Sequence, residues 1–319
     1  MIKNGALVIS LDFELLWGVF DKVEWREKRE YFRNTRKLIP EILQLFEKYE
    51  VSCTWATVGM LFNENWDEWN QNFPEMLPEY ENKNLSAYSY GKLIQSKETE
   101  ELCFAPNLIR RIIETPGQEV GSHTYSHYYC LEPGQSLESF KADLLKSQEL
   151  AKKFAIRLKS LVFPRNQYNK DYLQVCKETG LQNVRTNPDV WYWRNTQKDS
   201  LQQKIFRTGD AYFGLKNKSY KNIPELIPKL HGQKASRLLR PHSGRNFLDK
   251  KRVQRIQSEI NQAAKNKEIY HLWWHPHNFG GNPEKNLEEL DFILKHFKSC
   301  QNKFEFGSFN MAGITSHQR

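Results

Sequence analysis

Short apolar runs of strand length alternate along the chain with segments whose apolar residues recur at helical spacing. The first run, Ala6–Leu11, is almost continuously apolar, as expected for a strand that is buried on both faces. A helical pattern follows over Thr35–Tyr49, and a second strand is predicted at Val51–Val58. Strands that alternate with helices in this way are typical of parallel α/β folds.

The same alternation continues to the end of the sequence. It predicts helices over 106–115, 137–154, 170–179, 249–265 and 283–298, and strands over 118–121, 158–163, 183–186, 268–274 and 304–309. About seven β/α units fit a distorted or incomplete (β/α) barrel better than an open sheet. We therefore predict a single α/β domain over residues 1–319, with its reactive groups at the carboxyl ends of the strands.

A segment rich in Asn, Glu, Tyr and Trp, residues 63–105, interrupts this rhythm. We predict a surface insertion there, because long insertions of this kind are often functional. Aromatic residues of the insertion, and others near residue 191, are candidates for stacking on sugar rings, with core packing as the alternative. They are Trp66, Trp69, Tyr88, Tyr90, Trp191, Tyr192 and Trp193.

The charge is concentrated in one segment. The whole chain carries +9, and residues 198–267 hold 17 Lys/Arg and 5 Asp/Glu, which is +12 and leaves −3 for the rest. Such a run is most often solvated, and the alternative is contact with a diphosphate, an anionic glycan or the membrane surface. Because no nucleic-acid-binding motif accompanies the charge, we expect no nucleic-acid partner. The sequence also gives no reason to infer an obligate protein partner.

The apolar runs, the N-terminal residues and the cysteines bear on where in the cell the protein is located. No apolar run approaches the roughly 18 residues that cross a bilayer. Asp12 and Glu14 fall where a signal peptide would continue its apolar segment, so we expect a cytoplasmic protein, with the inner membrane surface as a variant of that location. The five cysteines are odd in number and form no CxxC pair, which argues against a disulfide framework and against a cysteine-bound zinc.

Polar residues of reactive types follow four of the predicted strands. Asp12 and Glu14, two positions apart on an extended chain, project to the same side, which suits a metal ligand beside a proton acceptor. The alternative is a helix cap with a first-turn glutamate. His123 and His127 are spaced to share one face of a helical turn and to bind one zinc ion, or else they are two hydrogen-bonded histidines.

The other two strand ends carry an arginine and two histidines. Arg165 lies in PRNQYN and is suited to orient a carboxylate or to bind an oxygen-rich substrate, although a turn with a cap at Asn169 also explains this segment. His275 and His277 follow an aromatic strand, where a general acid fits as well as a histidine bonded to the backbone. Four such strand ends together are far less expected by accident than any one of them.

In these motifs the chain resembles the polysaccharide deacetylase superfamily, carbohydrate esterase family four. SLDFE, GSHTYSH, FPRNQYN and HLWWHPH correspond in order to the family's motifs, and GSHTYSH is the most specific. The resemblance implies a distorted (β/α) barrel and the metal-dependent removal of an acetyl group from a sugar. It further implies that His123 and His127 bind a divalent metal, usually zinc, and that Asp12 is the catalytic base.

The resemblance also assigns the remaining roles. His275 would protonate the leaving amine, and Arg165 would hold Asp12 in its ionised orientation. Phe13 occupies the place of the family's usual second aspartate, so Glu14 becomes the third metal ligand. We prefer His275 to His277 as the acid because it directly follows the strand. Residues expected to contact the substrate are Asn166, Tyr168, Trp191 and His277.

The expected substrate is an acetamido sugar or an acetylated glycan intermediate of surface-polysaccharide biosynthesis, linked to a nucleotide or a lipid. Charge and location are the basis for that expectation. Two alternatives remain. In the first, the chain hydrolyses cyclic amides such as allantoin without a tightly held metal, as relatives with altered first motifs do. In the second, the chain is a glycan-binding barrel without catalysis.

Overall fold

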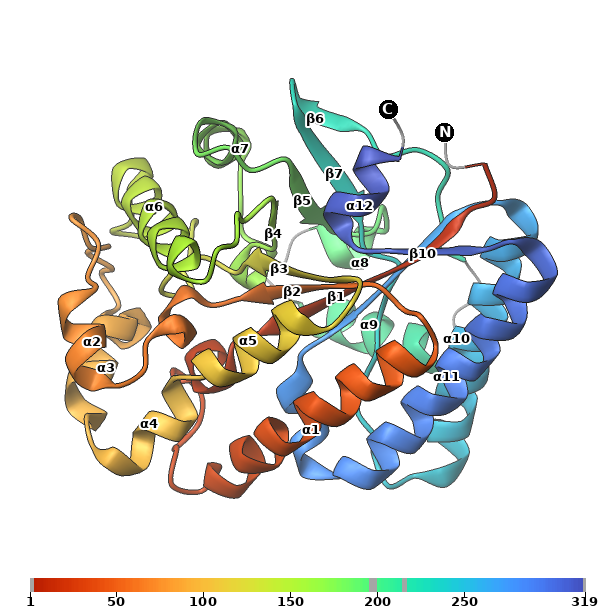
Figure 1. The fold of residues 1–319 in the computed structure, drawn as a ribbon, viewed down its shortest axis with the longest axis horizontal. Coiled ribbons are helices and arrows are strands. Elements are labelled where there is room, and N and C mark those ends of the chain that lie inside the picture. Colours follow the sequence, from red (N-terminus) through yellow and green to blue (C-terminus); the bar gives the residue numbers. More distant parts are fainter. Residues whose placement is uncertain (1–2, 195–199, 214–216, 318–319) are drawn as a thin grey trace.

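The computed structural model describes residues 3–194, 200–213 and 217–317. These residues are organised by a curled sheet of ten strands in the order β6-β7-β5-β4-β3-β2-β1-β9-β8, with β10 paired to β1 (Figure 1). Neighbouring strands are parallel except for the antiparallel pair of β6 and β7. In the described residues β6 and β8 are the two ends of this order, so the predicted incomplete (β/α) barrel is confirmed.

The strands are β1 (Ala6–Phe13), β2 (Cys53–Thr57), β3 (Gln118–Ser122), β4 (Ser160–Leu161), β5 (Asn183–Thr186), β6 (Glu225–Ile227), β7 (Leu230–Lys234), β8 (Arg237–Leu238), β9 (Ile269–Trp274) and β10 (Gly307–Phe309). The α-helices are α1 (Arg29–Lys48), α2 (Trp66–Gln71), α3 (Ala87–Ile94), α4 (Lys97–Cys103), α5 (Pro106–Glu114), α6 (Leu137–Lys153), α7 (Lys170–Glu178), α8 (Trp191–Arg194), α9 (Leu201–Phe213), α10 (Asn246–Asn266), α11 (Pro283–Phe304) and α12 (Met311–Ser316). Short 3-10 helices are η1 (Leu15–Gly18), η2 (Gly59–Phe62), η3 (Lys83–Leu85), η4 (Pro164–Asn166) and η5 (Pro276–Gly281).

The central strand β1 is buried along all eight of its residues, which explains its nearly continuous apolar sequence. Alternation along the strand places Leu7, Ile9, Leu11 and Phe13 on one face, in the main core that the outer helices cover. Ala6 and Val8 face the other side and pack with α12. Ser10 and Asp12 continue that second face, so polar groups of β1 point to the inside of the curled sheet.

The insertion predicted at 63–105 contains α2, η3, α3 and α4, which lie at one end of the molecule (Figure 1). Trp66, Trp69 and Tyr88 are buried there and belong to the main core. The alternative of core packing is therefore the correct one for these three side chains. Tyr90 is partly buried and packs against Phe20.

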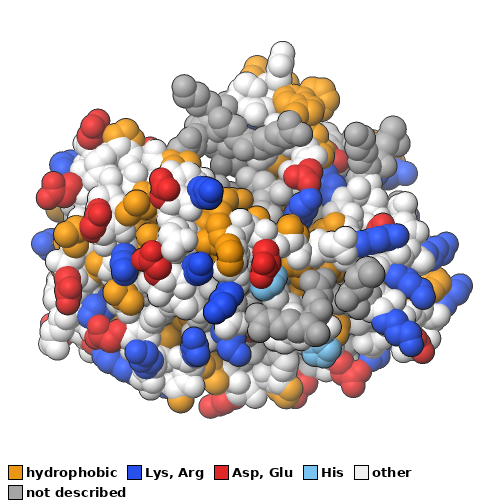
Figure 2. All heavy atoms as spheres, turned by 90° about the horizontal axis from the view of Figure 1, so that it is seen from above, with side chains coloured by type: hydrophobic (Ala, Val, Ile, Leu, Met, Phe, Trp, Pro, Cys, Tyr) orange, Lys and Arg blue, Asp and Glu red, His pale blue; other side chains and the backbone are white. Residues whose placement is uncertain are grey.

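The basic segment at 198–267 supplies α9, β6, β7, β8 and α10. Its strands were missing from the sequence prediction. Lys216, one of its basic residues, lies outside the described residues. Basic side chains gather toward the side of the molecule where α10 and α11 lie, whereas elsewhere on the visible face they alternate with acidic ones (Figure 2).

The five cysteines are buried and unpaired, as the sequence predicted. In the described part of the chain, the helices lack a segment that is both long and apolar enough to cross a bilayer.

Candidate metal and catalytic site

The carboxyl ends of β1, β3, β4 and β9 open into one pocket of about 300 Å³. Four of the predicted motifs therefore meet in space, as expected for a barrel. The pocket is lined by Asp12, Glu14, Gly18, Val19, Lys22, His123, His127, Phe163, Arg165, Asn166, Trp273, His275, His277 and Asn278.

Three buried side chains converge at the floor of this pocket. Glu14 Oε2 lies 3.1 Å from His123 Nε2 and 3.2 Å from His127 Nε2. In a tetrahedral zinc site with bonds of about 2.0–2.1 Å, neighbouring ligand atoms are about 3.3 Å apart. The three atoms are thus spaced as the ligands of one cation.

The protonation of the two histidines also suits a cation. His123 Nδ1 lies 2.8 Å from the carbonyl oxygen of Val162, which can only accept, so Nδ1 carries the proton and Nε2 presents a lone pair. Burial is the main cause that lowers the pKa of His127, which keeps this imidazole neutral. Glu14 Oε2 is buried without a hydrogen-bond donor. A divalent cation fits this donor set.

The loop that carries the two histidines is not the helical turn that their spacing predicted. Thr124 and His127 have positive φ angles of 62° and 56°. Asp143 of α6 holds the loop by accepting hydrogen bonds from the backbone N–H groups of Tyr125 (2.5 Å) and Ser126 (3.1 Å) and from the Ser126 hydroxyl (2.5 Å). The imidazoles converge through this buried scaffold instead of through a helix face.

The Glu14 carboxylate fits its place because Gly18, which faces it, has no side chain. Glu14 directly follows β1 and is the residue before η1, which ends at Gly18. A Cβ atom at Gly18 would lie 1.9 Å from Glu14 Cδ and 1.9 Å from Oε1. Glycine therefore leaves the space that the carboxylate occupies. Burial raises the pKa of Glu14, but nearby positive charge, that of His275 foremost, holds this pKa well below its usual range.

Asp12 is held by Arg185 of β5. Arg185 Nη1 and Nη2 donate to the two carboxylate oxygens over 2.6 and 2.7 Å, and both side chains are almost fully buried. The guanidinium lies 4.2 Å from the ring centre of Trp273 and also donates to the Ser10 hydroxyl over 3.0 Å. Burial raises the pKa of Asp12, but Arg185 and then His275 outweigh it, so the pKa is lowered and the carboxylate is ionised at neutral pH.

This pair corrects the role expected of Arg165, which does not take the place beside Asp12. Arg165 donates to Asp21 and lies 4.0 Å from the ring centre of Tyr129. Arg165 and Asn166, in the 3-10 helix η4 after β4, both have a φ angle of 52°, in the left-handed region. Both residues still line the pocket.

Arg185 was missed by the sequence analysis, although one signal was present. It stands in NVRT, a short buried strand, and a charge in such a strand requires a buried partner. The sequence does not reveal which residue is that partner, because Asp12 lies 173 residues away along the chain.

Two histidines follow β9 and differ in their environment. His275 Nε2 lies 3.5 Å from Asp12 Oδ2, and 27% of its side chain is exposed. His277 Nδ1 lies 3.6 Å from Glu14 Oε1 and is buried, and burial lowers the pKa of His277 to about 4. His277 is therefore neutral at pH 7. His275 is the one of the two that is open to a molecule in the pocket.

The remaining residues expected at the substrate lie elsewhere. Tyr168 stacks on Phe163 with ring centres 4.9 Å apart and is absent from the pocket lining. Trp191 is 48% exposed in α8 and packs against Phe206 of α9. The cap expected at Asn169 is present, because its side chain accepts from the N–H groups of Asp171 and Tyr172.

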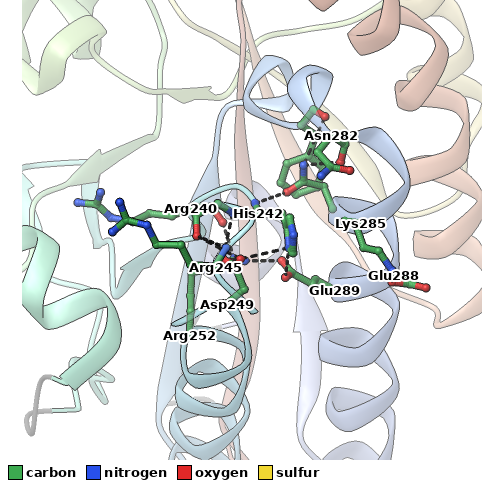
Figure 3. A network of polar contacts seen from close by, with 12 residues as sticks. Arg240, His242, Arg245, Asp249, Arg252, Asn282, Lys285, Glu288 and Glu289 are labelled. Atoms are coloured by element: carbon green, nitrogen blue, oxygen red, sulfur yellow. Dashed lines mark hydrogen bonds and ion pairs between the residues drawn. The ribbon is translucent and has the colours of Figure 1, made fainter. Parts of the chain in front are cut away.

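A second group of possible ligands, His242, Asp249 and Glu289, joins the loop after β8 to α10 and α11 (Figure 3). His242 Nδ1 lies 2.8 Å from Glu289 Oε1 and 3.4 Å from Asp249 Oδ2. Arg252 also pairs with both carboxylates. Because a guanidinium already supplies positive charge, this network needs no cation and acts as a clamp between the two helices.

The carboxyl ends of the strands are where barrel enzymes carry their active sites. A sequence model of the family "Polysaccharide deacetylase" matches residues 19–184, just over half of the chain. The chain therefore belongs to the polysaccharide deacetylase family, whose members hydrolyse carbon–nitrogen bonds of amides. The matched range includes His123, His127 and Arg165.

Solved structures share this fold at low sequence identity. A protein assigned as a polysaccharide deacetylase from Mycobacterium smegmatis has a TM-score of 0.62 and 12% identity, over 99% of this chain and 91% of that one. A second protein with this assignment, from Pseudomonas aeruginosa, has a TM-score of 0.55 and 9% identity over 95% and 86%. Puue allantoinase has a TM-score of 0.54 and 11% identity over 95% and 85%. The search of curated proteins found no significant match.

Proposed function

We propose that the chain is a metal-dependent hydrolase that removes an acetyl group from an acetamido sugar or an acetylated glycan intermediate. The observation that carries this proposal is the convergence of Glu14 Oε2 with the Nε2 atoms of His123 and His127 beside an ionised Asp12. Two imidazoles and one carboxylate are a common set for catalytic zinc, so zinc is the expected ion.

In this proposal, Asp12 accepts a proton from the attacking water, and His275 donates a proton to the leaving nitrogen. The oxygen of water bonds to the acetyl carbon, the carbon–nitrogen bond breaks, and the products are acetate and a free amine. When bound, the cation would polarise the acetyl carbonyl and lower the pKa of water. In this proposal Arg185 keeps Asp12 ionised and oriented, and the distance of 3.5 Å between His275 Nε2 and Asp12 Oδ2 supports an acid and a base that act at one reacting centre.

We assign the enzyme to the cytoplasm and to surface-polysaccharide biosynthesis, where it acts on a nucleotide- or lipid-linked intermediate. The support is the basic segment at 198–267, which carries a net charge of +12. A peripheral contact of this segment with the membrane surface belongs to the same proposal.

The test is acetate release from acetylated sugar oligomers by the purified full chain, before and after metal removal with a chelator and again after zinc is restored. We expect release to stop and to return with zinc. Asp12→Asn is expected to abolish release while metal content is retained. Asp171→Asn, exposed in the first turn of α7, is the matched control and keeps full activity.

Two results would contradict the proposal. Hydrolysis of a cyclic amide that is unaffected by the chelator indicates a metal-independent cyclic amide hydrolase. Glycan binding that is equal in Asp12→Asn and in the unaltered chain, without any hydrolysis, indicates a binding barrel.

A further inference from the structure

The helix α9 exposes an apolar face to solvent. Its side chains Leu201, Ile205, Phe206 and Phe213 are between 53% and 74% exposed, whereas Ala211 is buried. At about 3.6 residues per turn, these four exposed side chains fall within an arc of about 140° around the helix axis. Within residues 201–213, all of which the structure describes, that arc holds no Lys, Arg, Asp or Glu. The exposed face of the helix is therefore uncharged along its length.

The charged side of α9 faces the protein instead. Arg207 donates to the carbonyl oxygen of Tyr192 over 2.5 Å, and its guanidinium lies 4.7 Å from the ring centre of Trp193. Asp210 pairs with Lys218, and 11% of the aspartate side chain is exposed. A surface helix of a globular protein normally turns its apolar side to the core and its charges to water. Because α9 is packed the other way round, its apolar face is open to a partner.

Trp191 of α8 extends this face. Its side chain is 48% exposed, and its ring contacts that of Phe206 with ring centres 5.0 Å apart. We call Trp191, Leu201, Ile205, Phe206 and Phe213 the α9 patch. These five are half of the ten large hydrophobic side chains that are exposed in the described part of the chain. Single exposed apolar side chains are common on protein surfaces, whereas a group of this kind indicates contact with another molecule or with a membrane.

The charge around the α9 patch favours an anionic partner. The helix belongs to the segment 198–267, whose net charge is +12. Lys204 is exposed and lies at the edge of the apolar arc, whereas Asp210, the acidic residue of α9, is mostly enclosed in its ion pair. A second copy of the chain would bring the same positive charge to the contact, so repulsion opposes self-association. An aromatic and aliphatic face beside basic residues is the composition of helices that lie at the surface of a lipid bilayer.

We propose that the α9 patch docks the protein on a bilayer that contains anionic phospholipids. In the docked state, the patch lies at the boundary between headgroups and acyl chains, as the apolar faces of interfacial helices do. Trp191 suits this depth, because tryptophan is enriched where a membrane meets water. Lys204 adds attraction to the lipid phosphates.

The docking surface lies next to the pocket that holds Asp12 and Glu14. Trp193 of α8 contacts Trp273 edge to face with ring centres 6.2 Å apart, and Trp273 lines that pocket. Docking through the α9 patch thus holds the pocket close to the bilayer, where the sugar of a lipid-linked molecule is presented. The inference deepens the membrane contact of the proposed function and rests on that function for the substrate, a lipid-linked acetamido sugar. The docking surface itself rests on geometry and charge.

The first test is sedimentation of the purified full chain with vesicles of phosphatidylcholine, either alone or mixed with phosphatidylglycerol. We expect binding to the mixed vesicles, and binding to the neutral ones that is weaker by about fivefold or more. The double variant Leu201→Ser/Ile205→Ser is expected to bind the mixed vesicles about tenfold or more weakly, because two aliphatic side chains no longer enter the bilayer. The matched control is Leu93→Ser/Leu145→Ser, which removes two exposed leucines outside the patch and leaves binding unchanged.

Two results overturn the proposal. One is equal binding of the mixed vesicles by Leu201→Ser/Ile205→Ser and by the unaltered chain, and the other is no binding of these vesicles by the unaltered chain. Analytical ultracentrifugation without lipid tests the other occupant: a dimer that the double variant loses, together with no vesicle binding, assigns the patch to a second copy of the chain. Thermal unfolding of each variant separates a loss of binding from a loss of fold.

A probe of depth leaves the apolar side chains of the patch in place. An environment-sensitive fluorophore is attached to Gln202→Cys, within the apolar arc of α9, and in a separate protein to Gln174→Cys of α7. Both glutamines are exposed, and the five native cysteines are buried. With the mixed vesicles we expect a blue shift of the emission from the label at residue 202 and none from the label at residue 174. Equal responses of the two labels, or no response of either, contradict docking through α9.

These measurements also separate the docking surface from the proposed function. If no acetate is released from any substrate but the vesicle binding and the blue shift are found, the proposed function fails and the docking surface stands. If acetate is released but the α9 patch makes no difference to vesicle binding, the proposed hydrolase stands and the docking surface is overturned.

Discussion

Replacing Arg185 with methionine is the sharpest perturbation of the candidate site that the structure offers. The change removes two hydrogen bonds to Asp12, of 2.6 and 2.7 Å, and a third of 3.0 Å to Ser10. Methionine fills a comparable volume, so the main effect is a buried carboxylate left without its counter-ion. Only 2% of the arginine side chain and 4% of the aspartate side chain are exposed.

The magnitude follows from that burial. Removing one partner of a buried ion pair lowers the free energy of unfolding by about 3–5 kcal/mol. Asp12→Asn is expected to cost less, because the asparagine carbonyl still accepts from Arg185 and the guanidinium keeps its contact with Trp273. The double variant leaves no unpaired buried charge at these two positions, so it is expected to be more stable than Arg185→Met alone. The coupling free energy between the two positions is then about 2–3 kcal/mol.

The assay is urea denaturation at pH 7 of four proteins: the unaltered chain, both single variants and the double variant. Chelator is present throughout, because a metal bound only to the folded state would add its own stabilisation. Arg157→Met is the control, since Arg157 is exposed and a surface substitution changes the free energy by at most about 0.5 kcal/mol.

One contradicting result is a free energy of unfolding for Arg185→Met within about 1 kcal/mol of that of the unaltered chain, a difference far below the cost of breaking a buried pair. The other is a double variant that is less stable than Arg185→Met. Either result would mean that Asp12 does not depend on this arginine.

Three further substitutions test other parts of the site and the core. Gly18→Ala would displace the Glu14 carboxylate, so zinc affinity is expected to fall about 10–100-fold in a competition assay with a chromophoric chelator. Gly209→Ala, where a Cβ meets nothing within 4 Å, is the matched control, and equal affinities in both variants would contradict the packing argument. Asp143→Ala leaves buried N–H groups of the loop that carries His123 and His127 unpaired, so it is expected to lower the free energy of unfolding by about 2 kcal/mol or more. An unchanged free energy of unfolding in urea denaturation would show that the loop does not depend on Asp143. Trp69→Ala should cost about 3–5 kcal/mol of stability and leave KM unchanged, whereas a raised KM at full stability would restore a sugar-stacking role.

Most of the fold was predictable because its central strands are buried on both faces. β1 and β9 are almost continuously apolar, and the amphipathic helices between strands show the 3.6-residue period clearly. The strands β6, β7 and β8 were missed for a physical reason. They are short, lie toward the two ends of the sheet, and read ELI, LHGQK and RL, without alternation or a long apolar run.

The candidate site was predictable where a reactive residue directly follows a strand. Glu14, His123 and His275 meet that condition, Asp12 is the last residue but one of β1, and His127 follows four residues after His123; all five line one pocket. The pairing of charges was not predictable in the same way, because it depends on how the sheet curls.

Arg185 and Asp12 illustrate this limit. Their strands, β5 and β1, are separated in the sheet by β4, β3 and β2, and only the curvature of the barrel brings the two side chains together across its interior. The family resemblance implied this role for Arg165, but Arg165 and Asn166 have positive φ angles and the Arg165 side chain pairs with Asp21 instead. Left-handed backbone angles of this kind leave no mark in a hydrophobic pattern.

The central claim is that Glu14, His123 and His127 hold a catalytic metal ion. Its most direct test is anomalous diffraction at the zinc absorption edge from crystals grown with zinc. We predict a peak about 2.0–2.2 Å from Glu14 Oε2 and from the Nε2 atoms of His123 and His127. Zinc bound only elsewhere, for example at the His242 network, with none between these three atoms, would contradict the account.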